Sequence, residues 1–100
     1  MLHIVNKSPF EKNALESCLR LASKGDHVLL IEDAVVTAVA SNRFEKLIRN
    51  AQAHLTFYVL GPDLTARGLG NKSVVSNVSV IDYGEFVDLT EAHHPVQSWL

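Results

Sequence analysis

The chain has 100 residues, of which 47% are hydrophobic and 20% charged, and its formal net charge is −2. A chain of this length forms one domain with a single core. Its mild net negative charge excludes a positive field over the whole surface, which is what would attract nucleic acid. The nine Lys and Arg residues are scattered along the chain, so we expect no direct nucleic-acid binding.

No apolar run approaches the ~20 residues that span a bilayer. The first residues also lack the charged leader and long apolar core of a secretory signal. We therefore expect a cytoplasmic protein without membrane association, in which the lone Cys18 stays reduced.

Two apolar segments, Leu2 to Val5 and His27 to Ile31, predict short strands. The segment between them opens on Ser8-Pro-Phe-Glu11, the pattern of a capping box at a helix that begins near Pro9. Gly25 suits the left-handed residue that ends such a helix. Strand, helix and strand in this order predict a βαβ unit with parallel strands.

The next segment, Ala34 to Ala40, is apolar enough to be a strand, but a strand here would leave no connection back to the sheet. We predict a short buried helix capped by Asp33. A second short helix, capped by Asn42, carries apolar residues at helical spacing. Its inward face consists of Phe44, Leu47, Ile48 and Ala51.

The aromatic and β-branched segment His54 to Leu60 predicts a strand, which we place at the centre of the sheet. A short helical turn, Gly61 to Arg67, follows it and is closed by Gly68. Val78 to Ile81 predicts a fourth strand. Asp82 with Glu85 then caps a last helix that carries Phe86, Val87 and Leu89.

The tail from His93 to Leu100 is interrupted by Pro95 and ends on Trp99 and Leu100, which a free solvated tail rarely does. No linker or repeat divides the chain. The elements together predict an α/β fold in one domain, residues 1–100, with about four parallel strands and helices on both faces.

Cys18 is the only cysteine, so it cannot form an internal disulfide. It shares an apolar stripe of the first helix and lies well past the first turn, where the helix dipole does little to stabilise a thiolate. The other members of the stripe are Ala14, Leu15, Leu19 and Ala22. Spacing alone favours a buried, inert side chain, while a reactive thiol stays open as the alternative.

Polar residues follow each strand at the carboxyl edge of the predicted sheet, where open parallel sheets bind ligands. They are Asn6-Lys7-Ser8, Glu32-Asp33, Gly61-Pro62-Asp63 and Asp82-Tyr83. Helix capping explains most of them without a ligand, and a small anion at this rim is the alternative. We find no phosphate loop, no His or Cys spacing typical of a metal site and no serine-hydrolase triad, so no cofactor or metal is expected.

Several segments carry a family resemblance: Met1 to Phe10, Gly25 to Ala34, Tyr58 to Gly68, Ile81 to Thr90 and Val96 to Leu100. The H-x-x-x-K-S-P start, the D-L-x-A-R-G segment and the Trp near the end are specific in combination. The resemblance that these segments carry extends over essentially the whole chain. They resemble the DsrH/TusB subunits of intracellular sulfur-relay complexes.

The resemblance implies a DsrE-like α/β fold and a place in a heterohexamer with two homologous subunits, one of the DsrE or TusD type and one of the DsrF or TusC type. The principal sulfur-carrying cysteine of the family lies on the DsrE or TusD partner, which makes this chain an accessory subunit. A small sulfur-carrier protein of the DsrC or TusE type would give or take the sulfur as a cysteine persulfide.

The resemblance also implies a branch of the family. Cys18 matches a cysteine in the first helix of DsrH proteins, whereas TusB proteins generally lack it. This match implies dissimilatory sulfur oxidation, with Cys18 as the catalytic, sulfur-carrying residue. The alternatives are a TusB-like subunit serving 2-thiouridine formation at the tRNA wobble position, or a purely structural subunit with no sulfur on Cys18.

Overall fold

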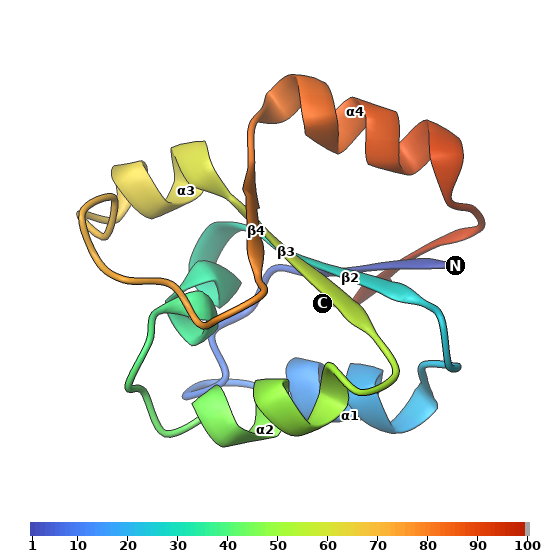
Figure 1. The fold of residues 1–100 in the computed structure, drawn as a ribbon, viewed down its shortest axis with the longest axis horizontal. Helices are drawn as coiled ribbons and strands as arrows, with labels where there is room; N and C mark the ends of the chain where they lie inside the picture. Colours follow the sequence, from blue (N-terminus) through green and yellow to red (C-terminus); the bar gives the residue numbers. More distant parts are fainter. Residues whose placement is uncertain (100) are drawn as a thin grey trace.

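A sheet of five parallel strands crosses the middle of the molecule (Figure 1). The computed structural model describes residues 1–99. The strand order is β4–β3–β2–β1–β5, with β1 at Leu2–Val5, β2 at His27–Leu30, β3 at Thr56–Leu60, β4 at Ser79–Ile81 and β5 at Val96–Trp99. The predicted α/β fold in a parallel sheet is confirmed, with one strand more than predicted.

Helices cover both faces of this sheet, as predicted. Figure 1 shows α1 and α2 on one face and α4 on the other, while the 3-10 helix η1 and α3 directly follow the carboxyl ends of β2 and β3. Their bounds are Ala14–Leu21 for α1, Glu32–Ala38 for η1, Glu45–Ala51 for α2, Gly61–Ala66 for α3 and Tyr83–Ala92 for α4. None of the helices within residues 1–99 is both long and apolar enough to cross a membrane.

The two faces bury unequal cores. Alternate strand residues point to opposite faces, so Val28 and Leu30 of β2 join the core under α1 and α2, whereas Leu29 joins the core under α4. The first core is the larger. Helix α4 has no fully buried residue and covers its face mainly with Phe86 and Leu89.

The first helix begins later than the capping-box pattern predicted, at Ala14. Ser8 closes a separate turn: its hydroxyl oxygen accepts from the Phe10 N–H at 3.2 Å, and its carbonyl accepts from the Lys12 N–H at 3.0 Å. The Ser8 hydroxyl therefore bonds a neighbouring backbone N–H, but the predicted capping box does not form among residues 1–99, and the segment forms a turn instead of the first turn of α1. The helix then starts after Asn13, whose side chain makes no cap hydrogen bond.

The second difference concerns the buried segment after β2. It is the 3-10 helix η1, and Asp33 does not cap it, because η1 begins at Glu32 and Asp33 lies within its first turn. The Asp33 carboxylate pairs with Arg67 at 3.0 Å. Its burial was predicted correctly: Ala34, Val35 and Ala38 all lie in the core.

The third difference is the tail, in which β5 pairs in parallel with β1. The register runs from Leu2 opposite Val96 to Val5 opposite Trp99. Because β5 occupies the edge, β2 is the central strand, and β3 lies between β2 and β4 instead of at the centre. The prediction that the tail packs against the protein is confirmed for the residues of β5, but the strand itself was not predicted. Leu100, which the same prediction included, lies outside the described residues.

The capping box of α4 is confirmed in both directions. The Asp82 carboxylate accepts from the Glu85 N–H at 2.8 Å, and the Glu85 carboxylate accepts from the Asp82 N–H at 3.2 Å. Two backbone donors at the start of α4 are thereby satisfied.

Replacing Asp82 with Ala should lower the free energy of unfolding by about 1 kcal/mol, because a backbone donor at the start of α4 loses its partner. Urea denaturation measures this loss. Asp88→Ala, which removes an exposed carboxylate further along the same helix, is the matched control. Equal losses in the two variants would contradict the role of the capping box.

Candidate functional site

Cys18 lies on the inner face of α1, and its side chain is fully buried in the larger core. The predicted apolar stripe is confirmed, with Ala14 and Leu15 buried beside it. Burial and, to a smaller extent, the negative charge of Asp26 raise the pKa of the Cys18 thiol to about 12. Since the thiolate is the attacking species in sulfur transfer, the thiol in this fold is neutral and shielded from any donor.

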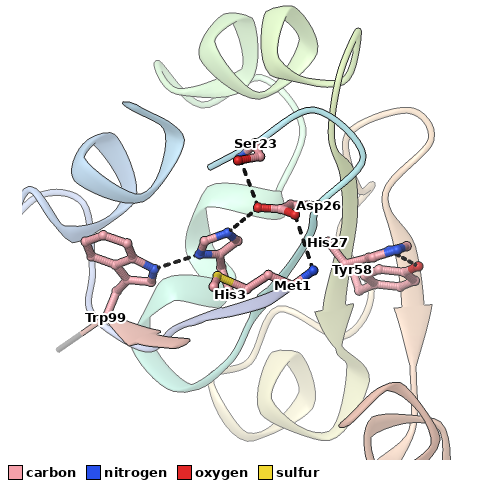
Figure 2. Close-up of polar contacts among 7 residues, drawn as sticks. All are labelled: Met1, His3, Ser23, Asp26, His27, Tyr58 and Trp99. Carbon is pink, nitrogen blue, oxygen red and sulfur yellow. Dashed lines mark hydrogen bonds and ion pairs between the residues drawn. The ribbon is translucent and has the colours of Figure 1, made fainter. Parts of the chain in front are cut away.

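A chain of hydrogen bonds links Trp99, His3 and Asp26 on the same side of the sheet (Figure 2). The Trp99 indole N–H donates to Nδ1 of His3 at 3.1 Å, and Nε2 of His3 lies 2.8 Å from Oδ2 of Asp26. An indole nitrogen can only donate, so Nδ1 of His3 is an acceptor and the ring proton sits on Nε2, facing the carboxylate. His3 is 2% exposed, and both of its ring nitrogens are engaged.

Asp26 is the hub of this network. Its carboxylate also accepts from the Ser23 N–H at 2.9 Å and pairs with the ammonium of Met1 at 3.3 Å (Figure 2). Burial opposes its negative charge, but the hydrogen bonds from His3 and Ser23 and the Met1 ammonium outweigh this effect and lower the pKa of Asp26 to about 2. The network thus holds a buried anion, and because both ring nitrogens of His3 are engaged, this histidine has no free nitrogen for proton transfer to a substrate.

A second cluster lies on the opposite face, under the end of α4. Nδ1 of His27 is 2.9 Å from the Tyr58 hydroxyl, and the His27 and His93 rings stack with centroids 3.7 Å apart. Burial, followed by the proximity of His93 and of the Met1 ammonium, lowers the pKa of His27, while burial raises the pKa of Tyr58. Within residues 1–99 no group of three or more His, Cys, Asp or Glu side chains is arranged to hold a metal ion.

The predicted carboxyl-edge residues serve the fold. The Glu32 N–H donates to the Asp63 carboxylate at 2.6 Å, Asp33 pairs with Arg67, and Asp82 caps α4. These three carboxylates, after β2, β3 and β4, are thus already engaged by backbone N–H groups or by Arg67, which argues against an anion site among them. Neither the Trp99–His3–Asp26 chain nor the His27–His93 stack was anticipated, although His3, Asp26 and Trp99 all lie in the segments that carried the family resemblance.

The lowered pKa of Asp26 makes stability depend on pH. The carboxylate has a pKa near 3.8 when unfolded and about 2 when folded, so it contributes about 2 kcal/mol above pH 4, and this contribution is lost as the pH falls through 2. Unfolding free energies from denaturant titrations between about pH 5 and pH 2 should therefore fall less steeply in Asp26→Asn than in the wild type. Asp88→Asn, which alters an exposed carboxylate, is the control, and parallel wild-type and Asp26→Asn profiles would contradict the role of the hub.

Comparisons with solved structures support the fold. The ychN protein of Escherichia coli superposes with a TM-score of 0.80 at 18% identity, over 97% of both chains. The MTH1491 protein of Methanobacterium thermoautotrophicum superposes with a TM-score of 0.74 at 16% identity, over 97% of this chain and 95% of that one. These likenesses confirm the predicted DsrE-like α/β fold.

Comparisons of sequence identify the family. The family model described as "DsrH like protein" matches residues 7–96. Protein TusB of Escherichia coli (strain K12) and Protein TusB of Shigella flexneri are each 39% identical over 99 residues, which cover 99% of this chain and the whole of theirs. The names of these relatives favour the TusB branch of the family over the DsrH branch, which the match of Cys18 had predicted. The chain belongs to the DsrH/TusB family.

Proposed function

We propose that this chain is an accessory subunit of a cytoplasmic sulfur-relay complex of the TusB type, which passes persulfide sulfur toward 2-thiouridine formation at the tRNA wobble position. The observation that carries the proposal is 39% identity to TusB proteins over 99% of the chain. The partners are homologous subunits of the DsrE or TusD type and of the DsrF or TusC type. A small carrier of the DsrC or TusE type exchanges sulfur with them.

The geometry of Cys18 supports an accessory role. A persulfide forms when a thiolate attacks the outer sulfur of a donor persulfide, so that a new S–S bond forms and the donor leaves as a thiolate. Cys18 is fully buried, and its pKa of about 12 leaves almost no thiolate at neutral pH. We infer that the chain contributes surface and rigidity to the complex and that the transferred sulfur stays on partner cysteines.

A second candidate function keeps Cys18 as the catalytic residue, a sulfur carrier in a DsrH-like complex for sulfur oxidation. Its position on the first helix, which matches that of the DsrH cysteine, favours this alternative. The thiol would have to become accessible when the subunits assemble, because α1 covers it in this fold. Carriage of sulfur by Cys18 therefore stays a prediction that the assembled complex must test.

Mass spectrometry of the reconstituted complex separates the two candidates. After incubation with a persulfide donor, we expect the mass of one added sulfur on a partner peptide and none on the peptide that contains Cys18. Complexes with Cys18→Ser or Cys18→Ala should transfer sulfur at the wild-type rate, and comparing these two variants controls for the polarity placed in the core. Added sulfur on the Cys18 peptide, with transfer lost in both variants, would favour the carrier role.

The pathway can be tested in cells. Deleting the gene should strongly reduce wobble 2-thiouridine in tRNA, because sulfur then fails to reach the modifying enzyme. Nucleoside analysis of total tRNA measures the loss, and plasmid copies of the wild type and of Cys18→Ala should restore the modification equally. Unchanged 2-thiouridine in the deletion strain would contradict the TusB-type proposal.

A further inference from the structure

One arginine lies against two aromatic rings that touch each other, in the segments that follow β1 and precede α2. Arg43 precedes α2, Phe10 lies in the loop that follows β1, and Phe44 is the residue just before α2. The Arg43 guanidinium carbon is 5.0 Å from the centre of the Phe10 ring and 5.1 Å from that of the Phe44 ring. The two rings meet edge to face at 5.3 Å. We call these three residues the aromatic–arginine cluster.

Hydrogen bonds fix both loops that carry the cluster. The Phe10 N–H donates to the Ser8 hydroxyl, which holds the turn after β1. The Phe44 N–H donates to the side-chain oxygen of Asn42 at 2.6 Å, and the Asn42 side-chain amide donates to the Thr37 carbonyl at 2.9 Å. The cluster therefore presents its side chains in one preformed arrangement, which reduces the entropy lost on binding.

The cluster leaves a large apolar ring exposed to solvent. Phe44 is 8% exposed and anchors the cluster in the core, whereas Phe10 remains 55% exposed although it is a large apolar ring. Exposed aromatic and arginine side chains that are already ordered are typical of residues that dominate binding at protein interfaces.

Arg43 has unused hydrogen-bonding capacity. Its guanidinium takes part in none of the ion pairs or side-chain hydrogen bonds among residues 1–99, whereas Arg49 pairs with Glu45 and Arg67 with Asp33. A planar guanidinium presents paired N–H groups that match the two oxygens of a carboxylate, and a neighbouring ring can cover the apolar part of the same partner residue.

We propose that the aromatic–arginine cluster docks an acidic segment of a homologous partner subunit, whose Asp or Glu carboxylate binds Arg43 while an adjacent apolar side chain packs on Phe10. This inference rests on the proposed place of the chain in a multi-subunit complex. The segments 7–12 and 41–46 contain four Lys or Arg and two Glu residues in a chain of net charge −2, so the surface around the cluster is locally positive and complements an acidic segment. A nucleic acid needs cations spread along a backbone track, which the chain does not provide.

Calorimetric titration of the full chain with the co-purified DsrE-type and DsrF-type subunits tests the docking site. Arg43→Ala should weaken binding about tenfold or more, and Arg43→Lys should not rescue it, because lysine keeps the charge but loses the paired N–H groups. Phe10→Ala should weaken binding comparably. Arg20→Ala is the matched control and should bind like the wild type. Arg20 is exposed on α1, and among residues 1–99 its guanidinium bonds only the Ser17 hydroxyl of its own helix.

The outcomes separate this inference from the proposed function. Tight wild-type binding that Arg43→Ala and Phe10→Ala leave unchanged would overturn the docking site and leave the proposed function standing. A wild-type chain that does not bind the partner subunits would overturn both. Binding of a single-stranded RNA oligonucleotide that Arg43→Ala abolishes, with subunit binding intact, would assign the cluster to nucleic acid and overturn the acidic-segment proposal. Circular dichroism melting shows that each variant is folded.

Discussion

The buried carboxylate of Asp26 joins parts of the chain that are far apart in sequence. It receives the Met1 ammonium, the backbone of Ser23 and the imidazole of His3, and through His3 it reaches Trp99 at the end of β5. A charge in this position costs several kcal/mol unless its partners are in place. These groups meet only when β1 lies between β2 and β5. The contacts that stabilise this one carboxylate therefore depend on the order of three strands.

The same anion constrains the chemistry of the larger core. A thiolate at Cys18 would be a second negative charge in the apolar layer that already holds Asp26, and both burial and the carboxylate oppose it. The pKa of Asp26 is lowered, whereas that of Cys18 is raised, although burial acts on both. The reason is that hydrogen-bond donors stabilise the charged form of Asp26, and the Cys18 thiol has no comparable donor among the described residues. Any nucleophilic role for Cys18 would therefore require α1 to separate from the sheet, at the cost of the core that α1 covers.

Local signals in the sequence predicted most of the fold. Asp82 with Glu85 caps α4 as their spacing predicted. Gly25 does adopt a positive φ of 92°, but it lies in the turn before β2 and does not end the first helix, which stops at Leu21 with Ala22 as its C-cap. The prediction that the first helix begins near Pro9 was wrong, because a serine can bond the same backbone groups when it closes a turn as when it caps a helix. The strand β5 and the polar network depend on contacts without a local signature, since His3 meets Asp26 from 23 positions away and Trp99 from 96.

The distribution of the remaining apolar and charged groups supports the proposal that this chain works in an assembly. A domain of 100 residues that is 47% hydrophobic cannot bury all of its apolar side chains, and here they remain exposed on separate elements: Leu21 on α1, Val80 on β4 and Val87 on α4. By contrast, two polar groups that could serve in catalysis, His3 and Asp26, are buried and hydrogen-bonded to each other. Cys18, His3 and Asp26 lie in the core, whereas Phe10, Arg43 and other apolar and cationic side chains lie at the surface. This distribution supports the proposed role of a subunit that contributes surface and leaves sulfur transfer to its partners.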